Sequence, residues 1–133
     1  MKHERYLLDT NICAFILRGR YDLDKKLKEV GIDNCFVSEI TVAELLYGAI
    51  WSGSEKNLKL TKKFCNKIEV LPIYDNLMEY AKQKSELRRQ GSLIDDFDLL
   101  IGCTAIVNDL ILVTDNVKHF NRLPVEIQNW VER

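Results

Sequence analysis

The sequence predicts an α/β fold, in which a mainly parallel, twisted sheet of four to five strands is flanked by helices. Short apolar segments, clearest at residues 6–8 and 110–113, alternate with segments of helical periodicity. This alternation favours parallel strands that are covered by helices on both faces. The chain has 133 residues, a length that suits a single domain over residues 1–133.

The first strand and the two helices after it are marked by local signals. Three apolar residues run into Asp9, which predicts a short buried strand that ends there. Helical periodicity then continues as far as Gly19, so that Thr10 or Asn11 opens a helix. Apolar residues at i, i+4 and i+7 among charged ones predict a surface helix over residues 21–30.

The next strand, over residues 35–37, leads into Ser38, a good N-cap for the amphipathic helix that follows. The apolar spacing predicts that the core face of this helix contains Val42, Leu45, Leu46, Ala49 and Ile50. Glu44 lies about 200° around the helix axis from the first of these residues, and therefore outside that face. The side of Glu44 also carries Tyr47, Gly48 and Trp51. Two aromatic side chains beside a glycine predict a surface for a partner, with chance exposure as the alternative.

The second half of the chain continues the alternation of helices and strands. In order, the predicted elements are a lysine-rich helix over residues 56–67, a strand over 68–73, a helix from Asp75 to Gln90, a helix over 99–107, a strand over 110–113, a helical turn up to Phe120 and a terminal strand or extension through Val125 and Ile127. Gly91 is the expected end of the first long helix. Residues 99–107 are apolar on all sides and therefore predict a buried helix.

Composition and charge exclude several classes of protein. The formal net charge is -1, so the chain lacks the basic character of many nucleic-acid binders, and any RNA contact needs a local basic patch. No apolar run is long enough for a signal peptide or a membrane span, so no membrane association is expected. The four cysteines lie in apolar surroundings without a C-x-x-C pair, which predicts reduced, buried thiols in a cytoplasmic protein rather than zinc ligands. His119 is expected to lie outside the chemistry.

Four acid-bearing positions are predicted to meet at one edge of the sheet, outside the carboxyl ends of the strands, where ligands of open α/β sheets bind. They are Asp9 after the first strand, Glu44 in the first turns after the second, Asp98 at the start of the buried helix, and Asp115 with Asn116 after the last strong strand. Converging acids repel and raise one another's pKa unless a cation compensates. Oxygen ligands without His or Cys indicate a hard ion, Mg²⁺ or Mn²⁺, and hence phosphoryl chemistry in which the metal activates water.

Each of these positions also has a purely structural explanation. Asp9 suits a helix N-cap, and Glu44 fits a Thr41-x-x-Glu44 capping box. Asp95 and Asp96 suit a helix N-terminus, and Asp115-Asn116 suits a turn. On the residues alone, metal-dependent hydrolysis of a phosphodiester or phosphate ester and purely structural roles are about equally supported.

Four sequence blocks occur in order along the chain: Leu7-Leu8-Asp9-Thr10-Asn11, Thr41-Val42-Ala43-Glu44-Leu45-Leu46-Tyr47-Gly48, Phe97-Asp98-Leu99-Leu100-Ile101 and Val113-Thr114-Asp115-Asn116. Together they resemble the motif blocks of PIN-domain ribonucleases, and in particular the VapC-type toxins of bacterial toxin–antitoxin pairs. The resemblance covers essentially the whole chain and implies a PIN-like single domain. It also implies a Mg²⁺- or Mn²⁺-dependent endoribonuclease that cleaves tRNA or rRNA, forms a homodimer and is inhibited by a VapB-type antitoxin.

The resemblance implies roles for individual residues. The catalytic, metal-binding acids correspond to Asp9, Glu44 and Asp98. The supporting residues, which orient the acids or the attacking water, correspond to Thr10, Asn11 and Thr114. Asn116 stands where the family often has a fourth acid, and it is the expected fourth catalytic residue. Asp115 is expected to support the site from its rim, because successive residues after a strand point in different directions.

Arg88 and Arg89 end a helix shortly before the acidic stretch. They are candidates for RNA contact, or they complement the negative C-terminal end of their helix. Two rival functions stay open, a phosphohydrolase of small phosphate esters and a non-catalytic PIN-like module that binds a partner. Assays on RNA and on a generic phosphate ester separate the two enzymes, and the absence of Mg²⁺ or Mn²⁺ binding would identify the module.

Overall fold

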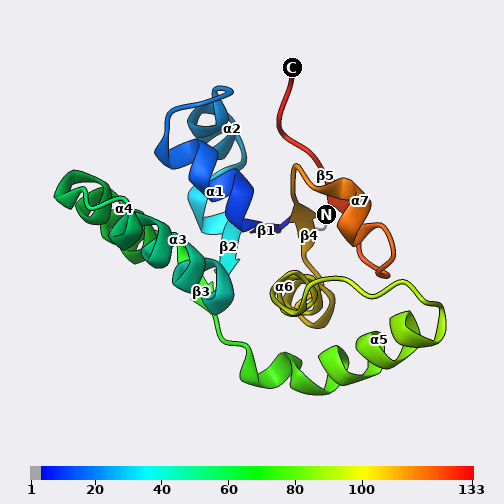
Figure 1. Cartoon of the computed structure of the whole chain (residues 1–133). Coiled ribbons are helices and arrows are strands. Elements are labelled where there is room, and N and C mark those ends of the chain that lie inside the picture. Colours follow the sequence, from blue (N-terminus) through cyan, green and yellow to red (C-terminus); the bar gives the residue numbers. More distant parts are fainter. Residues whose placement is uncertain (1–3) are drawn as a thin grey trace.

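The computed structural model describes residues 4–133, which form a five-stranded parallel sheet with helices on both faces (Figure 1). The strand order is β3-β2-β1-β4-β5, and every neighbouring pair is parallel. The elements are β1 (Tyr6–Leu8), α1 (Thr10–Leu17), α2 (Leu23–Val30), the 3-10 turn η1 (Ile32–Asn34), β2 (Cys35–Ser38), α3 (Glu39–Trp51), α4 (Glu55–Lys67), β3 (Glu69–Leu71), the 3-10 turn η2 (Tyr74–Asn76), α5 (Leu77–Arg89), α6 (Asp96–Val107), β4 (Ile111–Val113), α7 (Val117–Phe120) and β5 (Ile127–Gln128). The predicted α/β fold with a parallel sheet is therefore confirmed.

The helices form two layers, one on each face of the sheet. Tyr6 and Leu8 on β1 face the layer that contains α1, α2 and α4, whereas Leu7 between them faces the layer of α5, α6 and α7. Burial of a leucine side chain contributes about 1.5–3 kcal/mol, so this alternation anchors β1 in the centre of the fold. α3 contacts both α1 and α6 and thus connects the two layers.

Parallel pairing places the carboxyl ends of the strands along one edge of the sheet. α1 leaves this edge directly after β1, and α3 leaves it directly after β2. The register of β1 with β4 pairs Leu8 with Val113, and the backbone N–H of Asp9 continues the ladder by donating to Val113 at 2.9 Å. Asp9 is therefore fixed next to the segment that follows β4.

α6 and the segment around α7 approach closely at Gly102. A Cβ atom at this position would lie 2.5 Å from a methyl group of Leu123 and 3.5 Å from the ring of Phe120. Only glycine allows this approach without displacing the packed side chains. Phe120 is fully buried beside it, so α7 is held firmly against α6.

Some predicted elements differ from the structure. The strand expected over residues 68–73 is limited to Glu69–Leu71, because a proline without an N–H group follows directly. The helix expected from Asp75 begins with the 3-10 turn Tyr74–Asn76 ahead of α5. Ile50, predicted for the core face of α3, is 67% exposed. The carboxyl end of α3 projects with α4 beyond the sheet (Figure 1), so Ile50 does not pack into the core.

The prediction of buried thiols holds for three of the four cysteines, whereas Cys65 is partly exposed. All four are free, and three of them are buried. Burial raises the pKa of the Cys35 and Cys103 thiols to about 12, which keeps them protonated and unreactive at neutral pH. Within residues 4–133, no helix has both the length and the apolar character that crossing a lipid bilayer requires.

Candidate active site

Asp9 stands at the turn from β1 into α1 and is both a helix cap and a buried acid. Its Oδ1 accepts a hydrogen bond from the backbone N–H of Thr10 at 2.8 Å, and its Oδ2 accepts one from the hydroxyl of Thr114 at 2.7 Å. Only 4% of the residue is exposed. Burial raises the pKa of Asp9 from 3.8 to about 6 against the lowering effect of these hydrogen bonds, and the negative charges of Asp98 and Glu44 also raise it.

Glu44 reaches the same edge from α3 and is held by a chain of two hydroxyl groups. The Thr10 hydroxyl oxygen lies 2.7 Å from Oε1 of Glu44 and 3.0 Å from the hydroxyl oxygen of Thr41. An ionised carboxylate can only accept hydrogen bonds, so Thr10 donates to Glu44 and accepts from Thr41. The chain fixes one oxygen of Glu44 and leaves Oε2 for other partners.

The predicted capping box between Thr41 and Glu44 is wrong. α3 begins at Glu39, and its N-cap is Ser38, whose hydroxyl oxygen accepts from a backbone N–H two residues later at 3.1 Å. Thr41 therefore lies inside the helix, where it is fully buried and turns its hydroxyl toward Thr10. The packing of α1 against α3 makes this contact, and no local sequence signal points to it.

Asp98 lies in the first turn of α6, with 23% of its side chain exposed. Its charge is among those that raise the pKa of Asp9. The two preceding acids have other roles. Asp95 is the N-cap of α6, and Asp96 forms a salt bridge of 2.8 Å with Lys84 on α5.

His119 contacts Asp98, and the expectation that it lies outside the site is wrong. Its Nδ1 lies 3.2 Å from Oδ2 of Asp98 and 2.8 Å from the side-chain nitrogen of Asn116. The contact joins α7 to α6 across 21 residues of sequence, including β4. A histidine on a short helix carries no motif for such a contact, so sequence reasoning could not find it.

The segment after β4 is tied to the start of α1. The Thr114 hydroxyl, which donates to Asp9, also accepts from the backbone N–H of Asn116 at 2.9 Å. The side-chain oxygen of Asn11 accepts from the backbone N–H of Asp115 at 3.3 Å. These bonds hold the two chain segments side by side at the carboxyl edge of the sheet.

Asp115 is engaged by the C-terminal segment. Its two carboxylate oxygens accept hydrogen bonds from the guanidinium of Arg133 at 2.7 and 2.8 Å, and Asn129 donates to the same carboxylate at 3.1 Å. Chiefly because of Arg133, the pKa of Asp115 falls to about 2. The neighbouring Asn116 turns its amide toward His119 instead. A cation of the chain itself therefore neutralises Asp115, which makes it a poor ligand for a metal ion.

Asp9, Glu44 and Asp98 gather at one edge as an open set of oxygen donors. Among residues 4–133, no group of three or more Asp, Glu, His or Cys side chains is placed so that it could hold a metal ion by itself. Mg²⁺ is usually bound by one or two carboxylates and keeps several water molecules, so an open arrangement of carboxylates fits this ion and Mn²⁺. A cation would also offset the repulsion that contributes to the raised pKa of Asp9.

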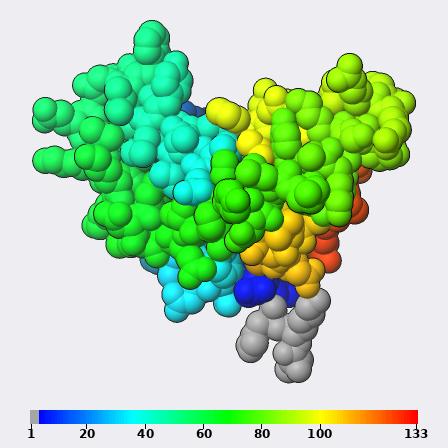
Figure 2. All heavy atoms as spheres, turned by 90° about the horizontal axis from the view of Figure 1, so that it is seen from below, coloured from blue at the N-terminus to red at the C-terminus, as the bar shows by residue number. Residues whose placement is uncertain are grey.

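Glu44 borders a groove between α1, α3 and α4, which neither Asp9 nor Asp98 lines. Thr10 and Glu44 line one end of the groove, and its walls include Gly48 and Leu60. Figure 2 shows the same edge of the molecule, where the surface is indented between the lobe of α3 and α4 and the lobe formed by α5 with the start of α6. An extended ligand in the groove could therefore reach Glu44 from outside.

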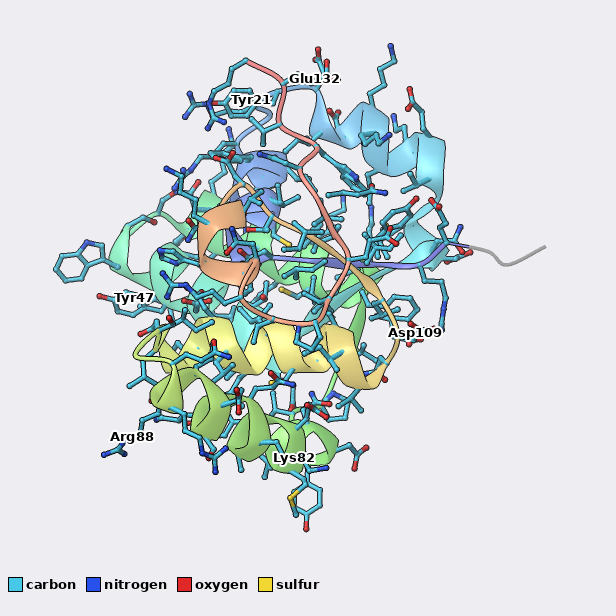
Figure 3. All side chains as sticks on the ribbon, turned by 90° about the vertical axis from the view of Figure 1, so that its right-hand side faces the viewer. Tyr21, Tyr47, Lys82, Arg88, Asp109 and Glu132 are labelled. Carbon is cyan, nitrogen blue, oxygen red and sulfur yellow. The ribbon has the colours of Figure 1, made fainter. Side chains whose placement is uncertain are left out.

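Large exposed side chains surround this edge. Tyr47 and Trp51 are 69% and 80% exposed, and Gly48 lies exposed between them on α3. Figure 3 shows Tyr47 and Arg88 projecting from the same side of the molecule, Arg88 from the end of α5. Arg89 forms an exposed ion pair of 3.4 Å with a glutamate of its own helix. Arg88 thus points outward on the same side as Tyr47 of α3.

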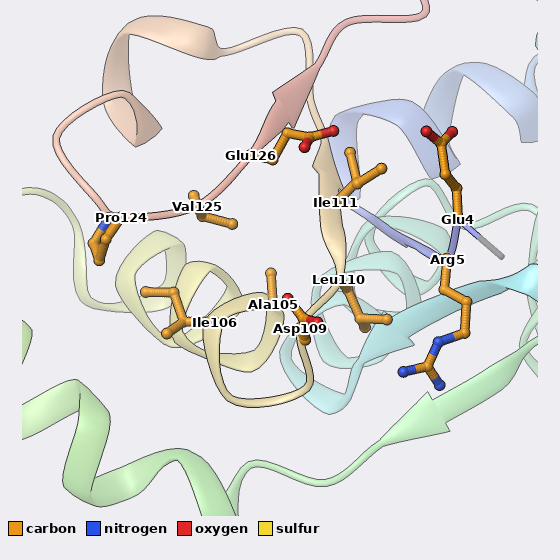
Figure 4. Close-up of a pocket in the computed structure, with 10 residues that line it drawn as sticks. All are labelled: Glu4, Arg5, Ala105, Ile106, Asp109, Leu110, Ile111, Pro124, Val125 and Glu126. Atoms are coloured by element: carbon orange, nitrogen blue, oxygen red, sulfur yellow. The ribbon is translucent and has the colours of Figure 1, made fainter. Parts of the chain in front are cut away.

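A second hollow lies at the opposite, amino edge of the strands (Figure 4). Its floor is apolar, with Ala105 and Val125 among its residues, and its rim carries Glu4, Arg5 and Glu126. The rim mixes both signs of charge, and none of the residues that line the hollow belongs to the acidic site. The chemistry predicted from the sequence therefore belongs to the carboxyl edge alone.

Comparisons with known proteins agree with this geometry. The family model of the PIN domain matches residues 6–126. The tRNA(fMet)-specific endonuclease VapC of Salmonella typhimurium is 31% identical over 130 residues, which cover 95% of this chain and 98% of that protein. Ribonuclease VapC2 of Haemophilus influenzae is 34% identical over 131 residues, or 96% and 98% of the two chains. The structure of VapBC2 from Rickettsia felis bound to a DNA fragment from its promoter contains a chain with a TM-score of 0.82 and 32% identity, with 94% of this chain and 98% of that chain covered.

Proposed function

Because the chain belongs to the PIN domain family and to its VapC ribonucleases, we propose that it is a Mg²⁺- or Mn²⁺-dependent endoribonuclease. It acts in the cytoplasm as the toxin of a type II toxin–antitoxin pair, with a VapB-type antitoxin as its inhibitor. The likeness to a chain of the Rickettsia felis VapBC2 complex supports such a partner. The Salmonella relative is named for tRNA(fMet), which makes tRNA the first substrate to test and rRNA the second.

The observation that carries the proposal is the buried carboxylate of Asp9. Its pKa is raised to about 6, and two further acids contribute to that rise from other elements. A structural N-cap needs only a side-chain oxygen that accepts a hydrogen bond from the backbone, and it needs no acidic neighbours. A buried acid with a raised pKa and acidic neighbours is typical of a functional site.

Each residue of the site has a task in the proposed reaction. Asp9 and Asp98 bind the principal metal ion, and Thr114 holds the Asp9 carboxylate in position. A metal ion bound there would activate a water molecule for attack on phosphorus and would stabilise the negative charge that develops as the P–O bond to the leaving strand breaks. Glu44 is held through Oε1 by Thr10, so its Oε2 is the oxygen left to orient the attacking water and accept its proton.

Other residues serve the substrate and the partners. Arg88 and Arg89 end α5 and contact the RNA backbone, which local cations must bind because the net charge of the chain is -1. The exposed face of Tyr47, Gly48 and Trp51 meets a second chain, either another copy in a homodimer or the antitoxin. Aromatic anchors beside a glycine allow the close packing that such interfaces use.

The test is cleavage of tRNA and rRNA by the purified protein with Mg²⁺, with Mn²⁺ and with EDTA. Asp9→Ala should lower cleavage by more than about 100-fold, because even the loss of an outer partner of a metal ligand costs about 10- to 100-fold. Asp96→Ala is the matched control, since this acid lies two residues from Asp98 but pairs with Lys84. It should cleave RNA like the wild type.

The alternatives give different results in the same experiment. A phosphohydrolase would act on a generic ester such as p-nitrophenyl phosphate and spare RNA. An interaction module would do neither and would bind no Mn²⁺ in calorimetry. Full RNA cleavage by Asp9→Ala would refute the assignment of the site.

A further inference from the structure

His119 is the nearest side chain to Asp98 that the proposed reaction leaves without a task. It lies on α7, and its Nδ1 is 3.2 Å from Oδ2 of Asp98. Half of its side chain is exposed, so burial alone does not explain the contact. Among residues 4–133, no other side chain or backbone group forms a hydrogen bond with the Asp98 carboxylate.

The neighbours of His119 determine which ring nitrogen carries the proton. The ionised carboxylate of Asp98 can only accept a hydrogen bond, so a bare Nδ1 would place two lone pairs against each other. Nδ1 therefore carries hydrogen and donates to Oδ2 of Asp98. The side-chain amide of Asn116, 2.8 Å from Nδ1, can exchange its oxygen and nitrogen by a half-turn and then presents the oxygen to the same N–H.

The packing of α7 keeps this hydrogen bond in place. Phe120, the residue after His119, is fully buried. Its ring lies 3.5 Å from the place of a Cβ atom at Gly102, which is four residues from Asp98 on α6. The packing of Phe120 thus keeps the backbones of the histidine and the aspartate close together, whereas the carboxylate itself could rotate without the histidine.

We propose that His119 is a positioning residue, whose Nδ1–H holds Oδ2 of Asp98 so that Oδ1 stays directed to a divalent cation. Metal ligands are commonly oriented by such outer partners, and their loss typically weakens metal affinity by about 10- to 100-fold. Asn116 contacts the same ring nitrogen and acts on the site through His119. The proposal rests on the proposed function, because it requires that Asp98 binds a metal ion.

Isosteric substitutions test which nitrogen matters. In His119→Asn the side-chain nitrogen takes the place of Nδ1, whereas in His119→Gln it takes the place of Nε2. We expect His119→Ala and His119→Gln to weaken Mn²⁺ binding in calorimetry by about tenfold or more. His119→Asn should keep an affinity close to that of the wild type. Lys118→Ala is the control for a change on the same short helix that does not touch Asp98.

The outcomes separate this inference from the function on which it rests. Equal Mn²⁺ affinity of the wild type, His119→Ala and His119→Gln would overturn the inference, while RNA cleavage that depends on Asp9 would leave the proposed function intact. Rescue by His119→Gln instead of His119→Asn would also overturn it, because Nε2 would then be the acting atom. A wild type that binds no Mn²⁺ would refute both. Thermal unfolding of each variant, followed by circular dichroism, confirms that the comparison is made on folded proteins.

Discussion

Asp9→Asn should make the metal-free protein more stable at pH 7, although it removes the central acid of the site. The folded protein raises the pKa of Asp9 from 3.8 to about 6. Each pKa unit corresponds to about 1.36 kcal/mol, so the ionised carboxylate destabilises the fold by up to about 3 kcal/mol. Asparagine is neutral and is as good an N-cap as aspartate, so the start of α1 is preserved.

The pH dependence gives the sign of this effect. Below pH 3.8 the Asp9 carboxyl group is protonated in both the folded and the unfolded chain. It then contributes nothing to the pH dependence of the free energy of unfolding. Between pH 3.8 and about 6 the unfolded chain loses its proton first, so the free energy of unfolding falls as the pH rises. Above about pH 6 Asp9 is ionised in both states, and the full destabilisation by its carboxylate is present. The advantage of Asp9→Asn should therefore be complete at pH 7 and vanish near pH 4.

Urea unfolding in EDTA at pH 7 and at pH 4 measures the effect. Asp95→Asn is the matched control, because Asp95 is also an N-cap whose side chain accepts from the backbone, but it is exposed. The control should show no gain at pH 7. Addition of Mn²⁺ should stabilise the wild type and not Asp9→Asn, which would reverse their order. If Asp9→Asn is no more stable than the wild type at pH 7, the carboxylate is not destabilised as the structure indicates.

Two further predictions concern the support of the site and its partner surface. Thr114→Val removes the hydroxyl that donates to Asp9 and should move the acid limb of the pH–activity profile up by about one to two pH units, since a hydrogen bond to a charged group is worth about 1.5–3 kcal/mol. Thr104→Val, which also loses a buried hydroxyl, should leave the profile unchanged, and an unmoved profile in both would contradict the role of Thr114. Trp51→Ala should weaken self-association or antitoxin binding by about 2 kcal/mol, or about thirtyfold, if its side chain is an interface anchor. Light scattering and inhibition assays measure this, and a dimer that the antitoxin still inhibits fully would show that Trp51 is not such an anchor.

The sequence was sufficient to predict the parallel sheet and the edge at which the acids meet. The signals were local, such as apolar runs that end on Asp9 and Ser38 and the breaks at glycines. Parallel pairing then places every strand end on one edge, so Asp9 and the start of α3 had to be neighbours there. The parallel topology therefore determines where the residues after each strand lie.

Contacts between distant segments could not be predicted in the same way. The hydroxyl chain from Thr41 through Thr10 to Glu44 depends on the relative rotation of α1 and α3, which no periodicity determines. Likewise, the approach of His119 to Asp98 depends on how closely α7 packs on α6. In both cases the sequence favours a simpler local interpretation. Thr41 and Glu44 suggest a capping box, and His119 is an isolated histidine in the sequence, but the packing of the helices gives these residues other contacts.

The position of Asp9, at a helix N-cap directly after a buried strand, both fixes its carboxylate and makes the ionised form unfavourable. The N–H of Thr10 and the hydroxyl of Thr114 fix both oxygens of its carboxylate, so the geometry is set before any cation arrives. Burial between Leu8 and α1 keeps water away and makes the ionised form costly. A divalent cation offsets that cost only when it binds at this carboxylate. In the proposed metal site, part of the metal affinity should therefore come from relief of the cost of ionising Asp9, a cost that is already present in the metal-free fold.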